Sequence, residues 1–307
     1  MERAYLGETG VCVSRVILGC GNFGGIGSAP AFFGGGESPE EAAAIMDAAW
    51  EAGITTFDTA DAYGGGRSEA SIGDWLRTKG PEVRDAIVLS TKTFNPMGEG
   101  EDHGLAPARV KRQLESSLRR LGVERVQMYL THDWDPDVPI AETLGVLDEL
   151  QHAGKIDAYG ASNVDAAQLR QALAVDLPTG YGWVQNSYSL LDRGAENELL
   201  PLCAERVLGF TPFSPLAGGW LTGKYRRNEP PPAGSRMTVR PEPYEHLQDA
   251  AVFDLLEDLE RRAVERRTTM AALAIAWLLA NPAVTAVVVG PRRPAHLEPA
   301  LAALAID

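Results

Sequence analysis

The chain has 307 residues, of which 45% are hydrophobic, and its formal net charge at pH 7 is −14. This length and hydrophobic content suffice for one large globular domain, and the negative charge argues against nucleic acid or an anionic membrane as the main partner. The three cysteines lack metal-binding or CxxC spacing, and there is neither a signal peptide nor an apolar run of about 18 residues, so we expect free thiols in a cytoplasmic protein.

Short strand-like segments alternate with helical patterns along most of the chain. A small hairpin is predicted first, from residues 4–6 and 11–13 around a Gly-Glu-Thr-Gly turn. Eight strands are then expected at 16–18, 56–58, 87–91, 127–130, 158–161, 183–185, 207–211 and 286–289. Helices are expected at 39–52, 68–79, 106–121, 140–153, 165–173, 196–205 and 268–279. This alternation indicates an α/β protein, a (β/α)8 TIM barrel with additional C-terminal helices, forming a single domain over residues 1–307.

Two segments interrupt the alternation. Residues 22–38 form a long glycine-rich loop after the first strand, and residues 217–247, rich in Pro and Arg, follow the seventh strand and lead into an additional helix. Gly19-Cys-Gly-Asn-Phe-Gly24 has the GxGxxG spacing of a dinucleotide-binding turn, but glycines and a proline follow it where that motif requires a helix. We therefore expect a flexible loop there, and long loops at strand carboxyl ends are where barrels carry specificity.

Polar side chains stand at the carboxyl ends of three consecutive barrel strands. Asp58 ends one strand and Tyr63 lies in the glycine-rich loop beyond it; Lys92 and His132 end the next two strands. Each has an ordinary alternative role, such as a capping Asp, a packed Tyr, a solvated Lys or a structural His. Adjacent strand ends converge on one mouth of a barrel, however, so the four groups are expected to meet.

Carbonyl reduction requires a set of groups of this kind. A phenol is a poor acid at neutral pH unless a neighbouring ammonium favours its phenolate. The ammonium must be held by a carboxylate, and a further donor must orient the carbonyl oxygen.

The stretch Gly53-Ile-Thr-Thr-Phe-Asp58-Thr-Ala-Asp-Ala-Tyr63, followed by Glu69-x2-Ile-Gly73, resembles the active-site signature of the aldo-keto reductases. The likeness runs from Leu6 to about Gly290, nearly the whole chain. It implies an NADP-dependent oxidoreductase in which bound nicotinamide transfers hydride and a tetrad of Asp58, Tyr63, Lys92 and His132 acts on the carbonyl. Tyr63 would donate the proton, Lys92 paired with Asp58 would lower its pKa, and His132 would hydrogen-bond the carbonyl oxygen.

The same resemblance assigns cofactor-binding residues along the later strand ends. These are Ser162, Asn163 and Gln185 at the carboxamide, Phe213 stacked on nicotinamide, Ser214, Leu216, Gly218 and Lys224 at the pyrophosphate, and Gly290, Arg292, Arg293 and His296 at the adenosine. Ser162 and Asn163 could instead cap a helix, Phe213 could be a core residue and the arginines a solvated pair. His296 stands where the family has Gln or Arg, and Ala300 where it has Asn. Because a guanidinium suits a 2′-phosphate, we expect NADPH rather than NADH.

The substrate is less closely defined by the sequence. Asn22, Phe23, Phe94 and Trp134 could form an apolar wall for uncharged aldehydes or ketones, or pack the barrel rim, and loop 22–38 could act as a lid. The scattered histidines argue against a metal site. Oligomeric state, physiological substrate and reaction direction are left open. Two other functions remain possible: a nicotinamide-binding regulatory subunit with little turnover, and an isomerase or hydrolase that uses Asp58 and His132.

Overall fold

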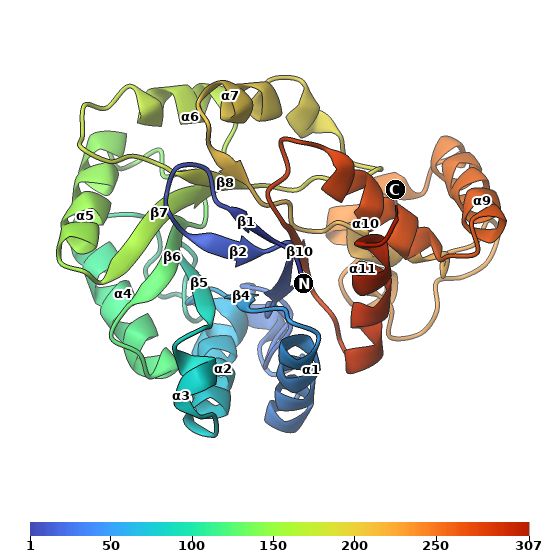
Figure 1. The fold of residues 1–307 in the computed structure, drawn as a ribbon, viewed down its shortest axis with the longest axis horizontal. Helices are drawn as coiled ribbons and strands as arrows, with labels where there is room; N and C mark the ends of the chain where they lie inside the picture. The colour runs from blue at the N-terminus through green and yellow to red at the C-terminus, as the bar shows by residue number, and fades with distance from the viewer. Residues whose placement is uncertain (307) are drawn as a thin grey trace.

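The computed structural model describes residues 1–306 and shows a ring of parallel strands surrounded by helices (Figure 1). The strands are β3 Val16–Gly19, β4 Thr56–Asp58, β5 Val88–Thr93, β6 Val126–Thr131, β7 Ile156–Ser162, β8 Trp183–Gln185, β9 Gly209–Phe210 and β10 Val287–Val289. They pair in the order β10-β3-β4-β5-β6-β7-β8-β9. The amides of Thr285 and Val288 donate to the carbonyls of Phe210 and Pro212 at 2.8 and 2.9 Å, which joins the two outermost strands. The expected (β/α)8 barrel is confirmed.

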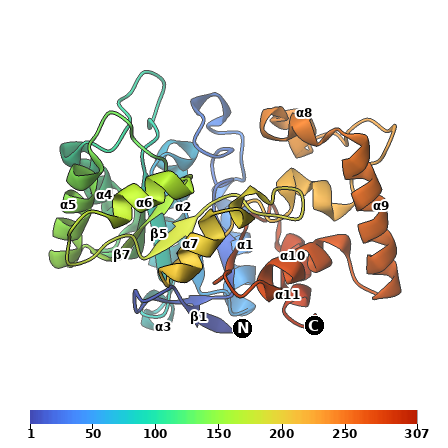
Figure 2. The same ribbon diagram turned by 90° about the horizontal axis from the view of Figure 1, so that it is seen from above.

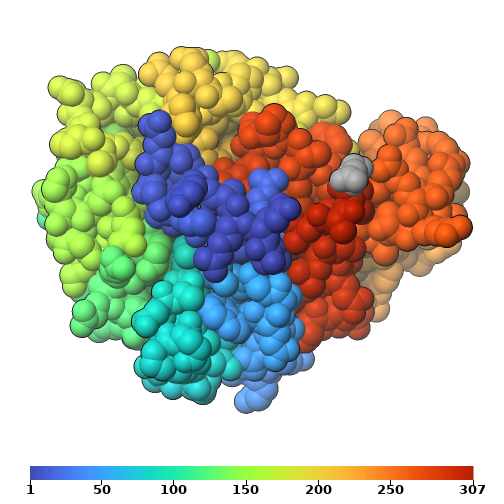
Figure 3. Space-filling model, viewed as in Figure 1, coloured from blue at the N-terminus to red at the C-terminus, as the bar shows by residue number. Residues whose placement is uncertain are grey.

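A hairpin of β1 Arg3–Tyr5 and β2 Cys12–Ser14 covers one end of the barrel. In Figures 1 and 3 it lies over the centre of the face in view. Leu6 and Val13 are fully buried in one apolar cluster with Met128 and Trp183 from the barrel strands. This plug lies at the amino ends of the strands, and Figure 2 shows the long loops and α8 (Arg236–Val239) at the opposite end. Ligands therefore have the carboxyl ends of the strands as their route of entry.

The helices predicted between strands are all present, with shifts of one to three residues at their ends. They are α1 Pro39–Glu51, α2 Arg67–Arg77, α4 Pro107–Leu121, α5 Ile140–His152, α6 Ala166–Leu173, α7 Leu199–Glu205 and α10 Met270–Ala280. Gly53, at φ +82°, supplies the left-handed residue that follows α1. Helix α7 begins at Leu199 rather than at residue 196, because Pro201 has no amide hydrogen and is tolerated only in a first helical turn.

Within residues 1–306, three further α-helices surround this frame besides α8. Helix α3 (Pro81–Arg84) is a short turn that the sequence analysis did not predict, while α9 (Ala250–Glu265) and α11 (Glu298–Ala303) are the expected additional helices. The glycines at 19–24 lead into a loop and not into a helix, as predicted. Within residues 1–306, none of the helices is long and apolar enough to cross a membrane.

Loop 22–38 is packed on two neighbouring segments. Phe23 and Glu37 form a β-bridge that closes the loop at its base. The amide of Gly64, in the turn after Tyr63, donates to the carbonyl of Gly27 at 3.1 Å. From the segment after α8, Arg240 donates to the carbonyl of Ile26 at 3.1 Å. The loop thus links the turn that carries Tyr63 with the excursion after β9. Whether it opens as a lid stays a prediction.

The contact between α2 and α4 depends on a glycine. A Cβ on Gly73 would lie 2.1 Å from the carbonyl oxygen of Arg120, a backbone atom that cannot move away cheaply. Gly145 in α5 is the matched control, since a Cβ there would meet no described atom within 4 Å.

We predict that Gly73→Ala lowers the free energy of unfolding by about 2 kcal/mol or more, because two helices must separate. Gly145→Ala should instead raise it by about 0.5–1 kcal/mol, as expected for an unhindered helical site. Urea unfolding of both variants tests this. Equal free energies of unfolding for the two variants would show that α2 and α4 can move apart at Gly73 without an energetic cost.

Candidate active site

A buried ion pair lies at the carboxyl ends of β4 and β5. The Nζ of Lys92 donates to Oδ2 of Asp58 at 2.6 Å and to the carbonyl of Thr59 at 2.8 Å. The Lys92 side chain is 0% exposed and that of Asp58 is 4% exposed. Two charges removed from water in this way are stable only with close pairing and further hydrogen bonds, and the site provides both.

Strand register explains why these groups meet. Asp58 lies opposite Ser90, and side chains two residues apart on a strand share one face, so Ser90 and Lys92 both point at Asp58. Oδ1 of Asp58 accepts from Oγ of Ser90 at 2.8 Å and from Nε2 of Gln185 at 3.1 Å. Ser90 was not predicted, although its position two residues before Lys92 was a usable signal.

Tyr63 and His132 complete the cluster. The Tyr63 Oη lies 3.4 Å from the Nζ of Lys92 and 3.4 Å from the Nε2 of His132. Tyr63 opens a short 3-10 helix, Tyr63–Gly66, in which Gly64 and Gly65 take positive φ angles that a residue with a side chain rarely adopts. The four residues expected to meet at the barrel mouth are therefore in contact.

Burial dominates the proton affinities in this cluster. It raises the pKa of the Tyr63 hydroxyl above its ordinary value, and the Lys92 ammonium only partly offsets this effect. Lys92 therefore lowers the pKa of Tyr63, as expected, but burial raises this pKa by more. Burial also lowers the pKa of His132 well below its usual range, and the charge of Lys92 adds to this. Burial opposes the charge of Lys92, but its electrostatic and hydrogen-bond interactions with Asp58 and Tyr63 outweigh this effect and leave the pKa of Lys92 raised.

Two asparagines fix the histidine. The Asn95 side-chain amide lies 3.2 Å from the Nδ1 of His132, and the Asn163 amide donates to the backbone carbonyl of His132 at 2.8 Å. The guanidinium of Arg109 in turn holds the carbonyl of Asn95 at 2.8 Å. With Nδ1 facing an amide donor, the ring proton of neutral His132 belongs on Nε2, which faces Tyr63. Asn95 was missed because nothing in the local sequence pattern marks it.

The residues expected at the nicotinamide lie around the same mouth. Ser162 and Gln185 are buried and pair in register at the ends of β7 and β8, whereas Asn163 is exposed at φ +56°. The N-cap of α6 is Asp165, so helix capping does not explain Ser162 or Asn163. Phe213 is half-buried against the barrel's inner apolar cluster.

The expected pyrophosphate segment follows β9 in an irregular backbone. Ser214 (φ +53°) and Gly218 (φ +65°) take left-handed angles, and Leu216 is half-buried between them. The Ser214 hydroxyl lies 3.2 Å from that of Tyr244.

Basic side chains gather where the expected pyrophosphate residue Lys224 meets the expected adenosine residues, near exposed Gly290. Burial and the charges of Arg236 and Arg292 lower the pKa of Lys224. Burial and the charges of Arg240 and Arg292 do the same for Arg236. Mutually repelling cations in a protein of net charge −14 form an environment that suits a phosphorylated ligand, so these residues fit a dinucleotide. Arg236 was not predicted, because the 217–247 excursion offers no pattern for placing it.

The two arginines predicted for a 2′-phosphate already have partners. The Nε of Arg292 donates to Oε1 of Glu37 at 2.7 Å, and the Nε of Arg293 donates to Nε2 of His296 at 2.8 Å. Burial and the charge of Arg293 lower the pKa of His296. Neither Glu37 nor its pairing with Arg292 was foreseen.

One residue of the expected substrate wall lies elsewhere. Phe23 is fully buried in the hydrophobic core, so its side chain fills the interior and forms no open wall. Phe94 and Trp134 are half-buried, and Phe94 packs edge-on against His103. The side chain of Asn22 accepts a hydrogen bond from Arg236 at 3.3 Å, which ties it to the basic region.

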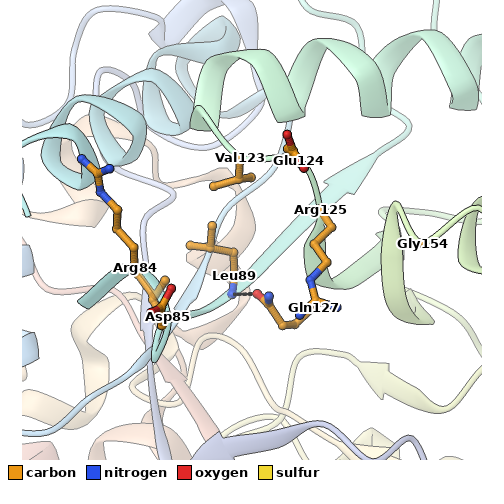
Figure 4. Close-up of a pocket in the computed structure, with 9 residues that line it drawn as sticks. Arg84, Asp85, Leu89, Val123, Glu124, Arg125, Gln127 and Gly154 are labelled. Carbon is orange, nitrogen blue, oxygen red and sulfur yellow. Dashed lines mark hydrogen bonds between the residues drawn. The ribbon is translucent and has the colours of Figure 1, made fainter. Parts of the chain in front are cut away.

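A separate surface pocket of about 510 Å³ lies at the opposite end of the barrel. Figure 4 shows Leu89 and Gln127 on its wall, where the Gln127 side chain accepts from the Leu89 amide at 2.9 Å. These residues begin their strands, and the pocket contains none of the residues of the buried cluster. It has no part in the candidate active site.

The structure is thus a (β/α)8 barrel with a buried Asp-Lys-Tyr-His cluster at the carboxyl ends of its strands. The sequence profile of the Aldo/keto reductase family matches residues 15–307, and the chain belongs to that family. It is 34% identical to the NADH-specific methylglyoxal reductase of Escherichia coli, over 100% of this chain and 94% of that protein. It is 33% identical to a probable voltage-gated potassium channel subunit beta of Oryza sativa, over 94% of this chain and 87% of that protein. Glycerol dehydrogenase of Gluconobacter oxydans superposes with a TM-score of 0.81 at 26% identity, covering 98% of this chain and 89% of that one.

A second buried carboxyl, that of Asp61, lies in the segment between Asp58 and Tyr63. The Oδ2 of Asp61 accepts from Thr93 at 2.7 Å, while its Oδ1 has no hydrogen-bond partner among residues 1–306. Burial, with the charge of Glu69, raises the pKa of Asp61 from 3.8 to about 7. Between these values the folded chain binds more protons than the unfolded one, so this group makes stability fall as the pH rises from about 4 to about 7.

We predict that Asp61→Asn raises the free energy of unfolding at pH 8 by about 1–3 kcal/mol and leaves it almost unchanged near pH 3.5. The exposed Asp176→Asn is the control and should give no such pH-dependent gain. Urea unfolding across pH 3.5–8 measures both. A gain that does not vary with pH would contradict the protonation argument.

Proposed function

We propose that the protein reduces an aldehyde or ketone to the alcohol with a nicotinamide dinucleotide as hydride donor. The observation that carries this proposal is the buried contact of Lys92 with both Asp58 and Tyr63, beside a neutral His132. A bound nicotinamide supplies the hydride. The chain's own residues then provide the proton and stabilise the charge that develops on the carbonyl oxygen.

The raised pKa of Tyr63 suits a proton donor that must hold its proton until the carbonyl oxygen becomes basic. Once the proton has left, the Lys92 ammonium stabilises the phenolate, and Asp58 keeps that ammonium charged and in place. The Nε2–H of neutral His132 is oriented to donate a hydrogen bond to the carbonyl oxygen. A charged imidazolium beside Lys92 would be costly, in agreement with its lowered pKa.

We propose NADPH as the preferred cofactor, with Ser162, Asn163 and Gln185 at the carboxamide and Lys224, Arg236 and Arg292 along the phosphates. The convergence of cations supports a phosphorylated ligand. The pairing of Arg292 with Glu37 and the NADH-specific relative in Escherichia coli favour NADH instead, and the Kd values of the two nucleotides for this protein decide between them.

The substrate we propose is a small uncharged aldehyde or ketone. Phe94 and Trp134 present partly buried apolar surface on the loops that follow β5 and β6, and Asn22 contributes a polar group from the opposite loop. Such walls exclude water and favour uncharged ligands.

A regulatory nicotinamide-binding subunit is the second candidate, and the rice relative favours it. The two functions differ in turnover, because a regulatory subunit requires nucleotide binding but no appreciable reduction. Addition of 4-nitrobenzaldehyde to the protein with bound NADPH separates them. Rapid oxidation of the nucleotide supports the reductase, whereas binding without oxidation favours the regulatory subunit.

Tyr63→Phe removes the proton donor and leaves the aromatic ring in place. We predict a loss of about 10²–10⁴-fold in kcat with nucleotide affinity changed less than about threefold. The exposed Tyr5→Phe on the hairpin is the matched control and should keep full activity. An undiminished rate in Tyr63→Phe would refute the assignment of Tyr63.

A further inference from the structure

Arg292 is held by a carboxylate from a distant part of the chain. Glu37, in the loop after β3, pairs through Oε1 with the Nε of Arg292 at 2.7 Å. The Glu37 side chain is 3% exposed and that of Arg292 is 48% exposed. A second bond, from Nη1 of Arg292 to the carbonyl of Gly234 at 3.3 Å, holds the guanidinium from the other side.

The backbone fixes Glu37 in this position. Its amide donates to the carbonyl of Asn22 at 2.9 Å, and its carbonyl accepts from the amide of Gly24 at 3.0 Å. A Cβ on the preceding Gly36 would lie 1.9 Å from the carbonyl oxygen of Asn22, so only glycine allows this close approach. The carboxylate is thus placed by the body of the protein and does not depend on a freely moving side chain.

The buried position of the Glu37 carboxylate beside Arg292 costs free energy. The Oε2 of Glu37 is buried without a hydrogen-bond partner in the described part of the chain, and burial raises the pKa of this carboxyl against the influence of Arg292. A buried acceptor without a donor is unfavourable. The Glu37–Arg292 pair lies in the region where the other cations gather. It is therefore in a position to affect the binding of a phosphorylated ligand.

We propose that Glu37 is a cofactor-selectivity residue that limits the preference of this protein for NADPH over NADH by occupying Arg292. A 2′-phosphate must compete with the carboxylate for the guanidinium and is repelled by its negative charge. A ribose 2′-hydroxyl carries no charge and can donate a hydrogen bond to a carboxylate. This inference rests on the proposed function, which puts the adenosine end of the cofactor beside Arg292.

Nucleotide fluorescence measures the Kd of NADPH and NADH for the unmodified protein, Glu37→Gln, Arg292→Ala and the double variant. Glu37→Gln keeps the shape and a hydrogen-bond acceptor but removes the charge. It should tighten NADPH about tenfold and change NADH less than about twofold. The double variant should lose this gain. Glu40→Gln, which removes one exposed charge from the first turn of α1, is the control and should leave both affinities unchanged.

The alternative is that the pair only fastens loop 22–38. In that case Glu37→Gln would weaken both nucleotides equally or leave their ratio unchanged, and the proposal would be overturned. Should Glu37→Gln alone fail to fold, the comparison of Arg292→Ala with the double variant decides, because the carboxylate left unpaired in Arg292→Ala should bind NADPH about tenfold more weakly than the double variant does. Equal NADPH affinities in these two variants would show that the charge of Glu37 does not act on the phosphate. If the unmodified protein binds neither nucleotide, the proposed function fails as well, and this outcome is distinct from binding with an unchanged ratio.

Discussion

The buried pairing of Lys92 with Asp58 is the constraint on which the rest of the site depends. An ammonium without access to water must have a carboxylate within hydrogen-bond distance, and that carboxylate needs donors of its own. The barrel meets these needs from three strands at once, through Asp58 on β4, Lys92 with Ser90 on β5, and Gln185 on β8. Closure of the strands into a ring is what brings β8 back to β4. The hydrogen bonds around the ion pair therefore depend on the closed barrel.

The mouth of the barrel contains two different electrostatic environments. Around Tyr63 and His132, burial favours neutral side chains beside a single compensated ammonium. Toward Lys224, Arg236 and Arg292, positive charge accumulates and is only partly balanced by Glu37. A ligand with an uncharged reactive end and an anionic tail matches both environments. In a chain of net charge −14, this group of cations is a local excess of positive charge.

The fold was largely predictable because strand and helix periods are properties of local sequence. The tetrad was predictable for a related reason: residues at the carboxyl ends of neighbouring strands must converge. Ser90 could have been found because it lies two residues before Lys92 on the same strand, so that both side chains share one face. Asn95, Arg236 and Glu37 could not, since they lie in loops whose contacts depend on how distant segments pack. Phe23 was misplaced because a loop residue beside the mouth can point inward, and local sequence does not show which way it turns. The early start expected for α7 overlooked the constraint that Pro201 imposes.

The hairpin that plugs the barrel has a practical consequence. Met1 packs against Gly53 at the end of α1, on the plugged face and away from the mouth. A fusion partner or a surface anchor joined to the amino terminus would thus extend from the closed end. Immobilised in this way, every molecule on a support would present its open mouth to the surrounding solution. The architecture separates a face that can be attached from a face that must stay accessible, which is a useful property for an electrode or a packed reactor.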